Sequence, residues 1–426
     1  MHIAFVDSNA AGLEAIGRAK DEGHLVSYVE SLKTYYPRTA ANQRLTERAD
    51  WIRRDVATTD AAAVTEVLAE CHAWHPIDFV VTTFELAAEA VALGAKALGL
   101  RCTSPDGVLT ARRKDLTRAA LRDAGLATPS YAVARDAGEA VATADSIGYP
   151  VVIKPPSGTD SKLTFVARDQ ADVRAGCAAT LSGPDAMPSL WQGLFRRGLL
   201  VEEHLAGPLV SVEIGMRDSR GHVFCISGRT RARDDEVVEI GPHIPAELTA
   251  GQARDCEAYA ESACRAVGLD VGVFHLEMIV TSRGPVLVEA NPRIMGGIMP
   301  TVYAHATGRN IYGEFLRLVS GAPMDAGPPS FDGCVTGRRF FAAGDGRLPE
   351  SLDTRWLEAY PDELIRFDPP EDLGLCPPQP VRRGTVVGRV IVRGADYAAT
   401  ARTGAQMASR MEESLGIELM RGEYDS

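Results

Sequence analysis

The first hundred residues alternate between short apolar runs and amphipathic stretches. The apolar runs lie at residues 2–7, 24–30 and 78–84. Stretches with a helical pattern lie at 10–23 and 85–99. Strands that alternate with helices are typical of a parallel sheet, so this region is predicted to form a Rossmann-like α/β domain. Because residues 7–12 lack a G-x-G-x-x-G sequence, we place no dinucleotide there.

The middle of the chain has a different pattern, in which apolar runs are joined by short polar or Gly-Pro turns. Such runs predict antiparallel strands, and they lie within 149–169, 199–216, 222–233 and 271–292. In the last of these, the turn T-S-R-G at 281–284 predicts a hairpin. A helix is predicted over 249–269, ended by Gly268. A Pro/Gly-rich stretch at 319–333 precedes a last region, in which 385–419 is predicted to form a strand and a helix.

Composition and charge limit the classes of function. The 426 residues are 45% hydrophobic and 24% charged, as in ordinary globular proteins, and suffice for about two to four domains. A formal net charge of -12 without a basic stripe argues against nucleic-acid binding. The eight cysteines form no C-x-x-C pair, which fits thiols in a reducing compartment better than disulfides or a zinc site.

The sequence also lacks the signals of membrane proteins and exported proteins. No apolar run approaches the roughly 18 residues that a membrane span needs. The N-terminus has neither the basic start nor the long apolar core of a signal peptide. We therefore expect a cytoplasmic protein with neither a membrane nor a nucleic-acid partner.

The segment V-L-V-E-A-N-P-R at 286–293 carries candidate chemistry. In a strand, Glu289, Asn291 and Arg293 emerge on one face, and the predicted hairpin places Glu277 on the neighbouring strand. Mg²⁺ takes oxygen ligands, commonly one or two carboxylates with phosphate oxygens and water, so this face is interpreted as a metal and phosphate site. The alternative is a solvated hairpin face. The apolar flanks argue against it, because a buried carboxylate is costly without a cation.

Two lysines and one acidic strand end are further candidates, and each has a simpler structural interpretation. Lys154 ends an apolar strand and precedes the polar loop P-P-S-G-T-D-S, which is suited to covering phosphates but is not a P-loop. Lysines at strand ends are usually surface residues, and Lys114 could equally be a surface charge on a helix. The stretch L-L-V-E-E-H-L at 199–205 could hold a purine, and alternation lets at most one of Glu202 and Glu203 face it.

In their order along the chain, these pieces resemble the ATP-grasp superfamily, in which ATP lies between two α+β subdomains. The stretches F-H-L-E-M, E-A-N-P-R-I-M-G-G and H-I-P-A-E-L look most like the carboxylate-amine ligases that join L-amino acids. The resemblance implies an α/β and α+β protein with an ATP-grasp fold, a Rossmann-like N-terminal domain and a small C-terminal α+β domain. The implied domains are 1–105, the two ATP-grasp subdomains 106–205 and 206–325, and 326–426.

The resemblance also implies roles for individual residues. The implied ATP-binding residues are Lys114, Lys154, Ser157, Gly158, Ser161, Glu202, Glu203 and Leu205, with Glu202 on the adenine amino group and the 157–162 loop as a flap. The implied metal ligands are Glu277, Glu289 and Asn291. The implied substrate-binding residues are His275, Arg293, Gly296 and Gly297, and Arg293 and Lys154 are the catalytic ones. From their positions we add Arg231 and Glu85 as substrate contacts, although both, like the strand histidine His275, could be structural.

The implied activity is formation of an amide from an amino acid carboxylate and an amine, through an acyl phosphate, with ATP and two Mg²⁺ ions as cofactors and Mn²⁺ as a substitute. Phosphoryl transfer needs positioning and charge neutralisation more than a nucleophile, which these residue types supply. Homodimers are common among such enzymes. The alternatives are a carboxylase-like or purine-pathway member of the superfamily and a catalytically idle nucleotide-binding regulator.

Two positions depart from the pattern of the superfamily. Leu209 stands where many relatives have an acid for the ribose, so either Glu213 or another group replaces it or the ribose hydroxyls are left to water. The phosphate loop has Gly158 alone, where relatives often carry several glycines.

Overall fold

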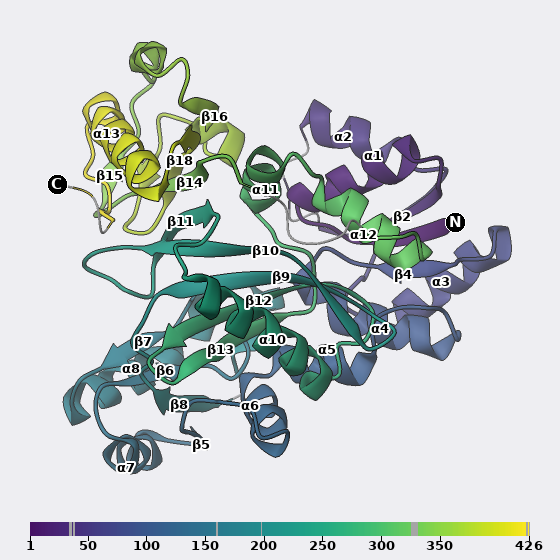
Figure 1. The fold of residues 1–426 in the computed structure, drawn as a ribbon, viewed down its shortest axis with the longest axis horizontal. Helices are drawn as coiled ribbons and strands as arrows, with labels where there is room; N and C mark the ends of the chain where they lie inside the picture. The colour runs from purple at the N-terminus through teal and green to yellow at the C-terminus, as the bar shows by residue number, and fades with distance from the viewer. Residues whose placement is uncertain are drawn as a thin grey trace. The chain divides into compact units, whose positions relative to one another are not determined.

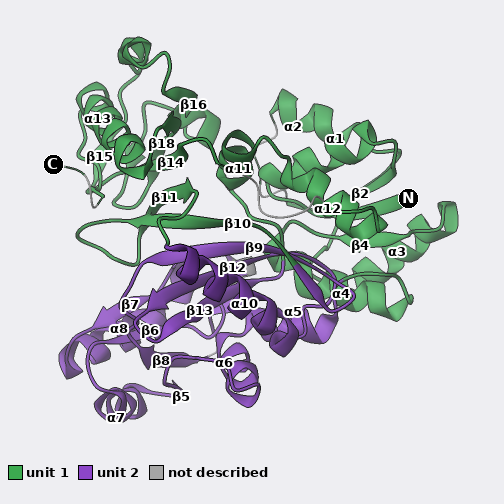
Figure 2. Cartoon of the chain, in the orientation of Figure 1, with its two compact units in different colours: residues 1–102, 222–248, 293–426 green, residues 103–221, 249–292 purple. Residues whose placement is uncertain are grey.

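The computed structural model describes residues 1–33, 36, 39–158, 161–196, 198–324, 331–422 and 425. The chain divides into two compact units (Figure 2). Unit 1 comprises residues 1–102, 222–248 and 293–426, and unit 2 comprises residues 103–221 and 249–292. The four domain ranges that were implied from the sequence stay a prediction.

Unit 1 begins with a parallel sheet of strand order β3-β2-β1-β4. Its strands are β1 (His2–Val6), β2 (Leu25–Ser31), β3 (Trp51–Val56) and β4 (Phe79–Val81). Its helices are α1 (Glu14–Asp21), α2 (Ala40–Thr46), α3 (Ala61–Trp74) and α4 (Ala88–Ala97). Apolar side chains such as Val6, Val80 and Leu68 are fully buried, which confirms the predicted Rossmann-like pattern. Helix α12 (Ile311–Ser320) also packs near this sheet. The ring of its Phe315 contacts the ring of Phe79 of β4, with the two ring centroids 5.9 Å apart.

Unit 1 also contains antiparallel strands in the order β10-β11-β14-β18-β16. Their bounds are β10 (Arg220–Arg231), β11 (Glu239–Ile244), β14 (Cys334–Phe341), β16 (Leu364–Asp368) and β18 (Val386–Gly394). A short pair joins β15 (Gly346–Arg347) to β17 (Pro380–Val381). Helix α13 (Tyr397–Leu415) lies against β14 and β18 (Figure 1), and its Met407 and Met411 are fully buried with Val390. Helix α11 (Met299–Thr307) packs on β11 and β14.

Unit 2 contains a four-stranded antiparallel sheet of order β5-β8-β6-β7. Its strands are β5 (Tyr131–Ala134), β6 (Val151–Lys154), β7 (Phe165–Ala167) and β8 (Leu199–Glu203). The helices of this part are α7 (Ala137–Ile147), α8 (Gln170–Ser182) and α9 (Ser189–Phe195). The buried residues Val151, Ile153, Leu199 and Val201 form its core with apolar residues of α7 and α8.

The other sheet of unit 2 has the order β13-β12-β9. Its strands are β9 (Leu209–Arg217), β12 (Gly272–Thr281) and β13 (Gly284–Asn291), so the predicted hairpin is confirmed. The accompanying helices are α5 (Pro105–Arg112), α6 (Lys114–Asp123) and α10 (Ala250–Val267). Thr249 and Gln252 form a capping box at the start of α10, and Gly268 ends it in the left-handed conformation, as its position predicted.

Short 3₁₀ helices complete the described elements: η1 (Ala11–Leu13), η2 (Glu85–Ala87), η3 (Gly183–Ala186), η4 (Arg355–Ala359) and η5 (Pro370–Leu373). All eight cysteines are free thiols. No helix among the described residues has both the length and the apolar character needed to cross a membrane.

Candidate functional site

Two neighbouring strands of unit 2, β12 and β13, carry the predicted metal ligands on one face. Glu277 of β12 lies directly opposite Glu289 of β13, and His275 lies opposite Asn291. On the other side of β12, His275 lies opposite Glu213 of β9. Directly opposed residues of an antiparallel pair place their side chains on the same face, with Cβ atoms about 4.5–5.5 Å apart. The hairpin therefore brings together the two carboxylates and the amide that alternation along the chain predicted.

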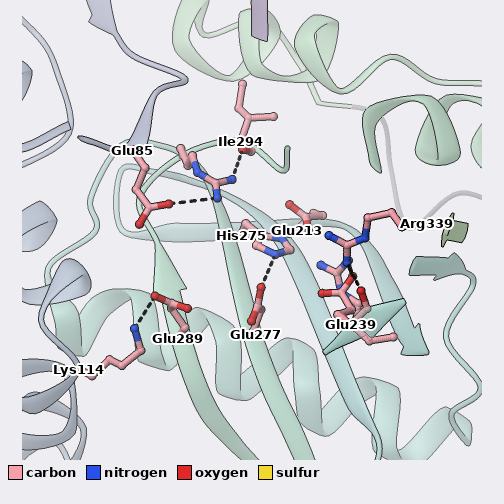
Figure 3. A network of polar contacts seen from close by, with 11 residues as sticks. Glu85, Lys114, Glu213, Glu239, His275, Glu277, Glu289, Ile294 and Arg339 are labelled. Atoms are coloured by element: carbon pink, nitrogen blue, oxygen red, sulfur yellow. Dashed lines mark hydrogen bonds and ion pairs between the residues drawn. The ribbon is translucent and has the colours of Figure 1, made fainter. Parts of the chain in front are cut away.

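His275 lies between two carboxylates. Its Nδ1 atom contacts Glu213, and its Nε2 atom lies 3.1 Å from Oε1 of Glu277 (Figure 3). Glu213 is completely buried, whereas the side chain of Glu277 is 24% exposed. The suggestion that Glu213 replaces the missing ribose acid is therefore not supported, because this carboxylate lies behind His275 with no exposed surface. His275 instead connects a buried acid to a predicted metal ligand.

Lys114 lies beside the same hairpin. Its ammonium donates to Oε1 of Glu289 at 2.7 Å (Figure 3), and its backbone N–H donates to the carbonyl oxygen of Pro156 at 2.8 Å. The residue is only 8% exposed, so it is not the surface charge of the simpler interpretation. The side chain of Glu289 remains 23% exposed. Lys114 thus connects the start of α6 with both the hairpin and the predicted phosphate loop.

Lys154 is part of a buried ion cluster with Glu202 and Arg118. The ammonium of Lys154 contacts Glu202, and Arg118 donates to the same carboxylate from Nε at 2.9 Å and from Nη2 at 3.3 Å. Arg118 also donates to the carbonyl oxygen of Val288 at 2.8 Å. Burial by itself raises the pKa of Glu202, but Arg118 and Lys154 outweigh it and lower this pKa to about 2. Glu202 therefore stays ionised at neutral pH.

This cluster changes the interpretation of Glu202. Its side chain is 1% exposed and already engaged by two cations, so the predicted contact with an adenine amino group is not available in this arrangement. Sequence reasoning did not identify Arg118. The signal that could have found it is its spacing, because Arg118 lies four residues after Lys114 and residues at that spacing share a helix face.

The predicted phosphate loop follows Lys154. Ser157 is 1% exposed, and its hydroxyl has no hydrogen-bond partner within the described part of the chain. Ser161 has a positive φ of 53°. Thr159 and Asp160 of the predicted flap lie outside the described residues. A buried hydroxyl without a described partner, in the loop that follows the buried Lys154, fits the addition of an anionic group such as a nucleotide phosphate.

The predicted adenine hinge lies at the end of β8. The backbone N–H of Glu203 donates to the carbonyl oxygen of Ser130, and its side chain contacts Arg283 at 2.5 Å. Leu205 is 7% exposed. The hinge segment is thus held mainly by strand pairing and by this ion pair.

Arg293 belongs to unit 1, where it contacts Glu85. Its Nη2 atom lies 3.3 Å from Oε2 of Glu85, and its Nη1 atom donates to the carbonyl oxygen of Ile294 at 3.1 Å (Figure 3). A Cβ atom at Gly296 would lie 3.4 Å from Nη1 of Arg293, so the side chain lies over this glycine. Gly297 has a positive φ of 61°. The structure therefore brings together Arg293, Glu85 and Gly296, which were predicted separately as substrate contacts.

Arg231, the other predicted substrate contact, lies on β10 of unit 1. Its Nη1 atom lies 4.0 Å from Oε2 of Glu236. Arg229 lies two residues earlier on β10 and contacts Glu239 of β11, which also contacts Arg339 of β14. None of these three was predicted. The β10–β11 register shifts between Thr230 and Arg231, so that Arg231 lies opposite Glu239 in the strand pairing, while the side chain of Arg229 contacts Glu239.

The donors on the hairpin fit a hard divalent cation. No three His, Cys, Asp or Glu side chains group as a metal site in the described ranges. The set formed by Glu277, Glu289 and Asn291 offers carboxylate and amide oxygens only. Mg²⁺ commonly takes one or two protein carboxylates and completes its shell with phosphate oxygens and water. These residues therefore fit Mg²⁺, or Mn²⁺, bound together with a nucleotide.

Comparison with known proteins identifies this arrangement. Residues 147–302 match the family model of the ATP-grasp domain. The chain carries an ATP-grasp domain. The domain includes Lys154, the β8 hinge and the β12–β13 hairpin, and the predicted ATP-grasp fold is confirmed.

Relatives and solved structures extend the likeness beyond the ATP-grasp domain. An L-amino acid ligase from Bacillus licheniformis matches with a TM-score of 0.73 over 99% of both chains, and at 19% identity this likeness establishes the fold. The uncharacterized protein y4rH of Sinorhizobium fredii is 28% identical over 258 residues, 57% of this chain and 49% of that protein, so the chain spans about half its length. A formate-dependent phosphoribosylglycinamide formyltransferase of Solidesulfovibrio magneticus is 26% identical over 329 residues, 75% of this chain and 77% of that protein.

Proposed function

We propose that the protein is an ATP-dependent carboxylate-amine ligase. It activates the carboxylate of an amino acid as an acyl phosphate and condenses it with an amine, a second amino acid, with release of ADP and phosphate. The observation that carries the proposal is the group formed by Glu277, Glu289 and Asn291 on one face of the ATP-grasp domain, with Lys114 bound to Glu289. The fold likeness to an L-amino acid ligase supports amino acids as the substrates.

Each group has a task in this proposal. Lys114, Lys154 and the loop at Ser157 bind the nucleotide phosphates, and Arg293 binds the carboxylate that is activated or the phosphoryl group that is transferred to it. Glu277, Glu289 and Asn291 hold Mg²⁺, which when bound neutralises charge on the phosphates. Phosphoryl transfer depends on positioning and charge stabilisation, so cationic groups at fixed positions are the main requirement.

The proposed reaction has two steps. A carboxylate oxygen attacks the γ-phosphorus, the bond from this phosphorus to the β,γ-bridging oxygen breaks, and ADP leaves. The nitrogen of the second substrate then attacks the carbonyl carbon, the bond to the phosphate oxygen breaks, and the nitrogen loses a proton. Arg293 favours the first step because its planar fork of donors matches a carboxylate or phosphate. We assign no residue to the removal of the proton.

Phosphate release measured against amino acids tests the proposal. Purified protein is incubated with ATP, Mg²⁺ and each of the twenty amino acids, singly and in pairs, and the products are analysed by mass spectrometry. Phosphate release that requires a particular pair and yields its dipeptide is the expected result. ATP binding without release for any pair would contradict the amino acid assignment and favour a nucleotide-binding regulator.

A second candidate is supported by the formyltransferase relative, whose name includes formate and phosphoribosylglycinamide. The same assay therefore includes formate together with phosphoribosylglycinamide. Release that depends on this pair, and on no amino acid pair, would assign the protein to the purine-pathway alternative.

A further inference from the structure

Unit 1 contains a cluster of two arginines that share one carboxylate. Nη1 of Arg229 and Nη2 of Arg339 each lie 3.1 Å from Oε1 of Glu239. Figure 3 shows Arg339 beside Glu239. The guanidinium of Arg339 also donates to the backbone carbonyl oxygen of Glu239 at 2.5 Å. The side chain of Arg229 is 3% exposed, whereas those of Glu239 and Arg339 are 23% and 30% exposed. A buried cation is therefore joined to a partly accessible one through a single carboxylate.

The neighbouring strands add further positive charge. Arg389 of β18 lies directly opposite Arg339 on the same face, and Asp368 of β16 lies opposite Arg389. Asp368 is itself bound to Arg366 at 2.6 Å. Burial lowers the pKa of Arg389, and Arg339 and Arg366 lower it further against the opposing effect of Asp368. Among the described residues of these strands, the arginines on this face therefore outnumber the carboxylates, although the protein as a whole has a net charge of -12.

Arg339 keeps donor capacity on this face. A guanidinium has five N–H donors, and the contacts of Arg339 to Glu239 and to the carbonyl oxygen of Ile240 use Nε and Nη2. Nη1 makes no hydrogen bond to any residue that the structure describes. Together with its exposure, this leaves Arg339 able to bind an anion from solution.

The cluster lies on the face of β14 that the segment after Arg293 covers. A Cβ atom at Gly337 would lie 2.4 Å from Cδ1 of Ile298, so this segment packs directly on Gly337. Arg339 lies two residues further along the strand, and residues at that spacing share a face. Two arginine sites, one at Arg293 and one at Arg229 and Arg339, are thus contributed by a single unit of the chain.

We propose that Arg229 and Arg339 bind the carboxylate of the amine substrate, so that this substrate is an amino acid and not a simple amine. The inference rests on the proposed function. Joining two amino acids requires the protein to treat two carboxylates differently, because one is activated and the other is left unreacted. Arg293 is assigned to the first, and the second arginine site holds the other. Arginine suits this task because its planar fork binds a carboxylate with two hydrogen bonds.

The test separates activation of the first carboxylate from binding of the second. Hydroxylamine is an amine without a carboxylate and converts acyl phosphates to hydroxamates, so hydroxamate formation reports activation alone. The variants are R339Q, R339K and R229Q. R402Q is the matched control, because Arg402 is an exposed arginine on α13. R339Q is the decisive variant because its side chain is partly exposed, whereas loss of the buried Arg229 could impair folding.

We expect R339Q to raise the KM for the amino acid that serves as the amine by about tenfold or more, because charge-assisted hydrogen bonds are lost. The KM of R339Q for hydroxylamine should differ from that of the wild-type protein by less than about twofold. The KM of R339K for the amino acid should lie between those of the wild-type protein and R339Q. The wild-type protein should prefer this amino acid to its carboxamide by about tenfold or more. R402Q should match the wild-type protein.

Two results overturn the inference while leaving the proposed function intact. One is equal use of the amino acid and its carboxamide by the wild-type protein. The other is an R339Q variant whose KM values for the amino acid and for hydroxylamine are both unchanged or change together. A wild-type protein that forms no hydroxamate with any of the twenty amino acids would instead contradict the proposed function itself.

Discussion

Replacement of Glu202 or Arg118 tests whether the buried cluster of Glu202, Arg118 and Lys154 stabilises the fold or binds the base of the nucleotide. Glu202 is held by Arg118 and Lys154, and all three are at most 7% exposed. In the folded protein the pKa of Glu202 is about 2, compared with an ordinary value of 4.5. At about 1.4 kcal/mol per pH unit, this difference corresponds to roughly 3 kcal/mol of stability that depends on the charge of Glu202.

The pH window of this contribution follows from the direction of the shift. A carboxyl whose pKa is lowered by folding stabilises the folded state above its unfolded pKa, and this stability is lost as the pH falls from 4.5 toward about 2. At neutral pH, the E202Q variant should therefore lose about 3 kcal/mol, and R118M about 3–5 kcal/mol because the carboxylate then keeps only Lys154. The double variant should lose less stability than the sum of the two single losses, because the two residues are in direct contact.

Urea denaturation followed by fluorescence and circular dichroism measures these changes. R122M is the matched control, because Arg122 lies on the same helix, one turn further on, with its side chain 62% exposed. Base recognition is measured separately as the ratio of affinities for ATP and inosine triphosphate, which lacks the amino group. This ratio should be unchanged in E202Q. An E202Q variant with wild-type stability and a lost preference for ATP would refute the structural interpretation and restore the predicted adenine contact.

Three further predictions concern single carboxylates. E289Q should lower ATP turnover by about 100-fold or more with an unchanged circular dichroism spectrum, because it removes a metal ligand and the partner of Lys114; unchanged turnover, as in a D255N surface control, would contradict the metal assignment. E213Q should leave the ratio of turnover with ATP to turnover with 2′-deoxy-ATP unchanged, because Glu213 is buried and contacts His275. Loss of the preference for ATP over 2′-deoxy-ATP in E213Q would instead make Glu213 a ribose ligand. D7N should stabilise the protein by at most about 3 kcal/mol at pH 8 and by almost nothing at pH 4, because burial raises the pKa of this carboxyl to about 6 and its ionisation opposes folding above that pH; equal urea midpoints of variant and wild type at pH 8 would argue against it.

The parts of the site that sequence reasoning predicted depend on local geometry. The turn at 281–284 and the alternation of polar residues after it determine that Glu289 and Asn291 share a face, and the hairpin then places Glu277 opposite Glu289. The same holds for the capped helix α10, whose start and end signals lie within the helix and its flanks. Patterns with a period of two or of 3.6 residues contain this information directly.

The parts that sequence reasoning missed are contacts between distant segments. Arg118 and Glu202 are 84 residues apart, and Arg339 and Glu239 are 100 residues apart. No local sequence pattern predicts which distant carboxylate an arginine side chain will contact. The register shift between Thr230 and Arg231 is likewise a detail of strand pairing that no local pattern predicts. The role of Arg231 as a substrate contact stays a prediction.

The missed contacts share a feature that bears on function. Arg118 and Lys154 share Glu202 in unit 2, and Arg229 and Arg339 share Glu239 in unit 1. Within the described residues, two cations contact one carboxylate in each cluster. Burial of a cation is unfavourable unless other groups compensate its charge. In the proposed reaction an anionic ligand adds to this compensation at each cluster, the nucleotide phosphates at Lys154 and the carboxylate of the amine substrate at Arg339.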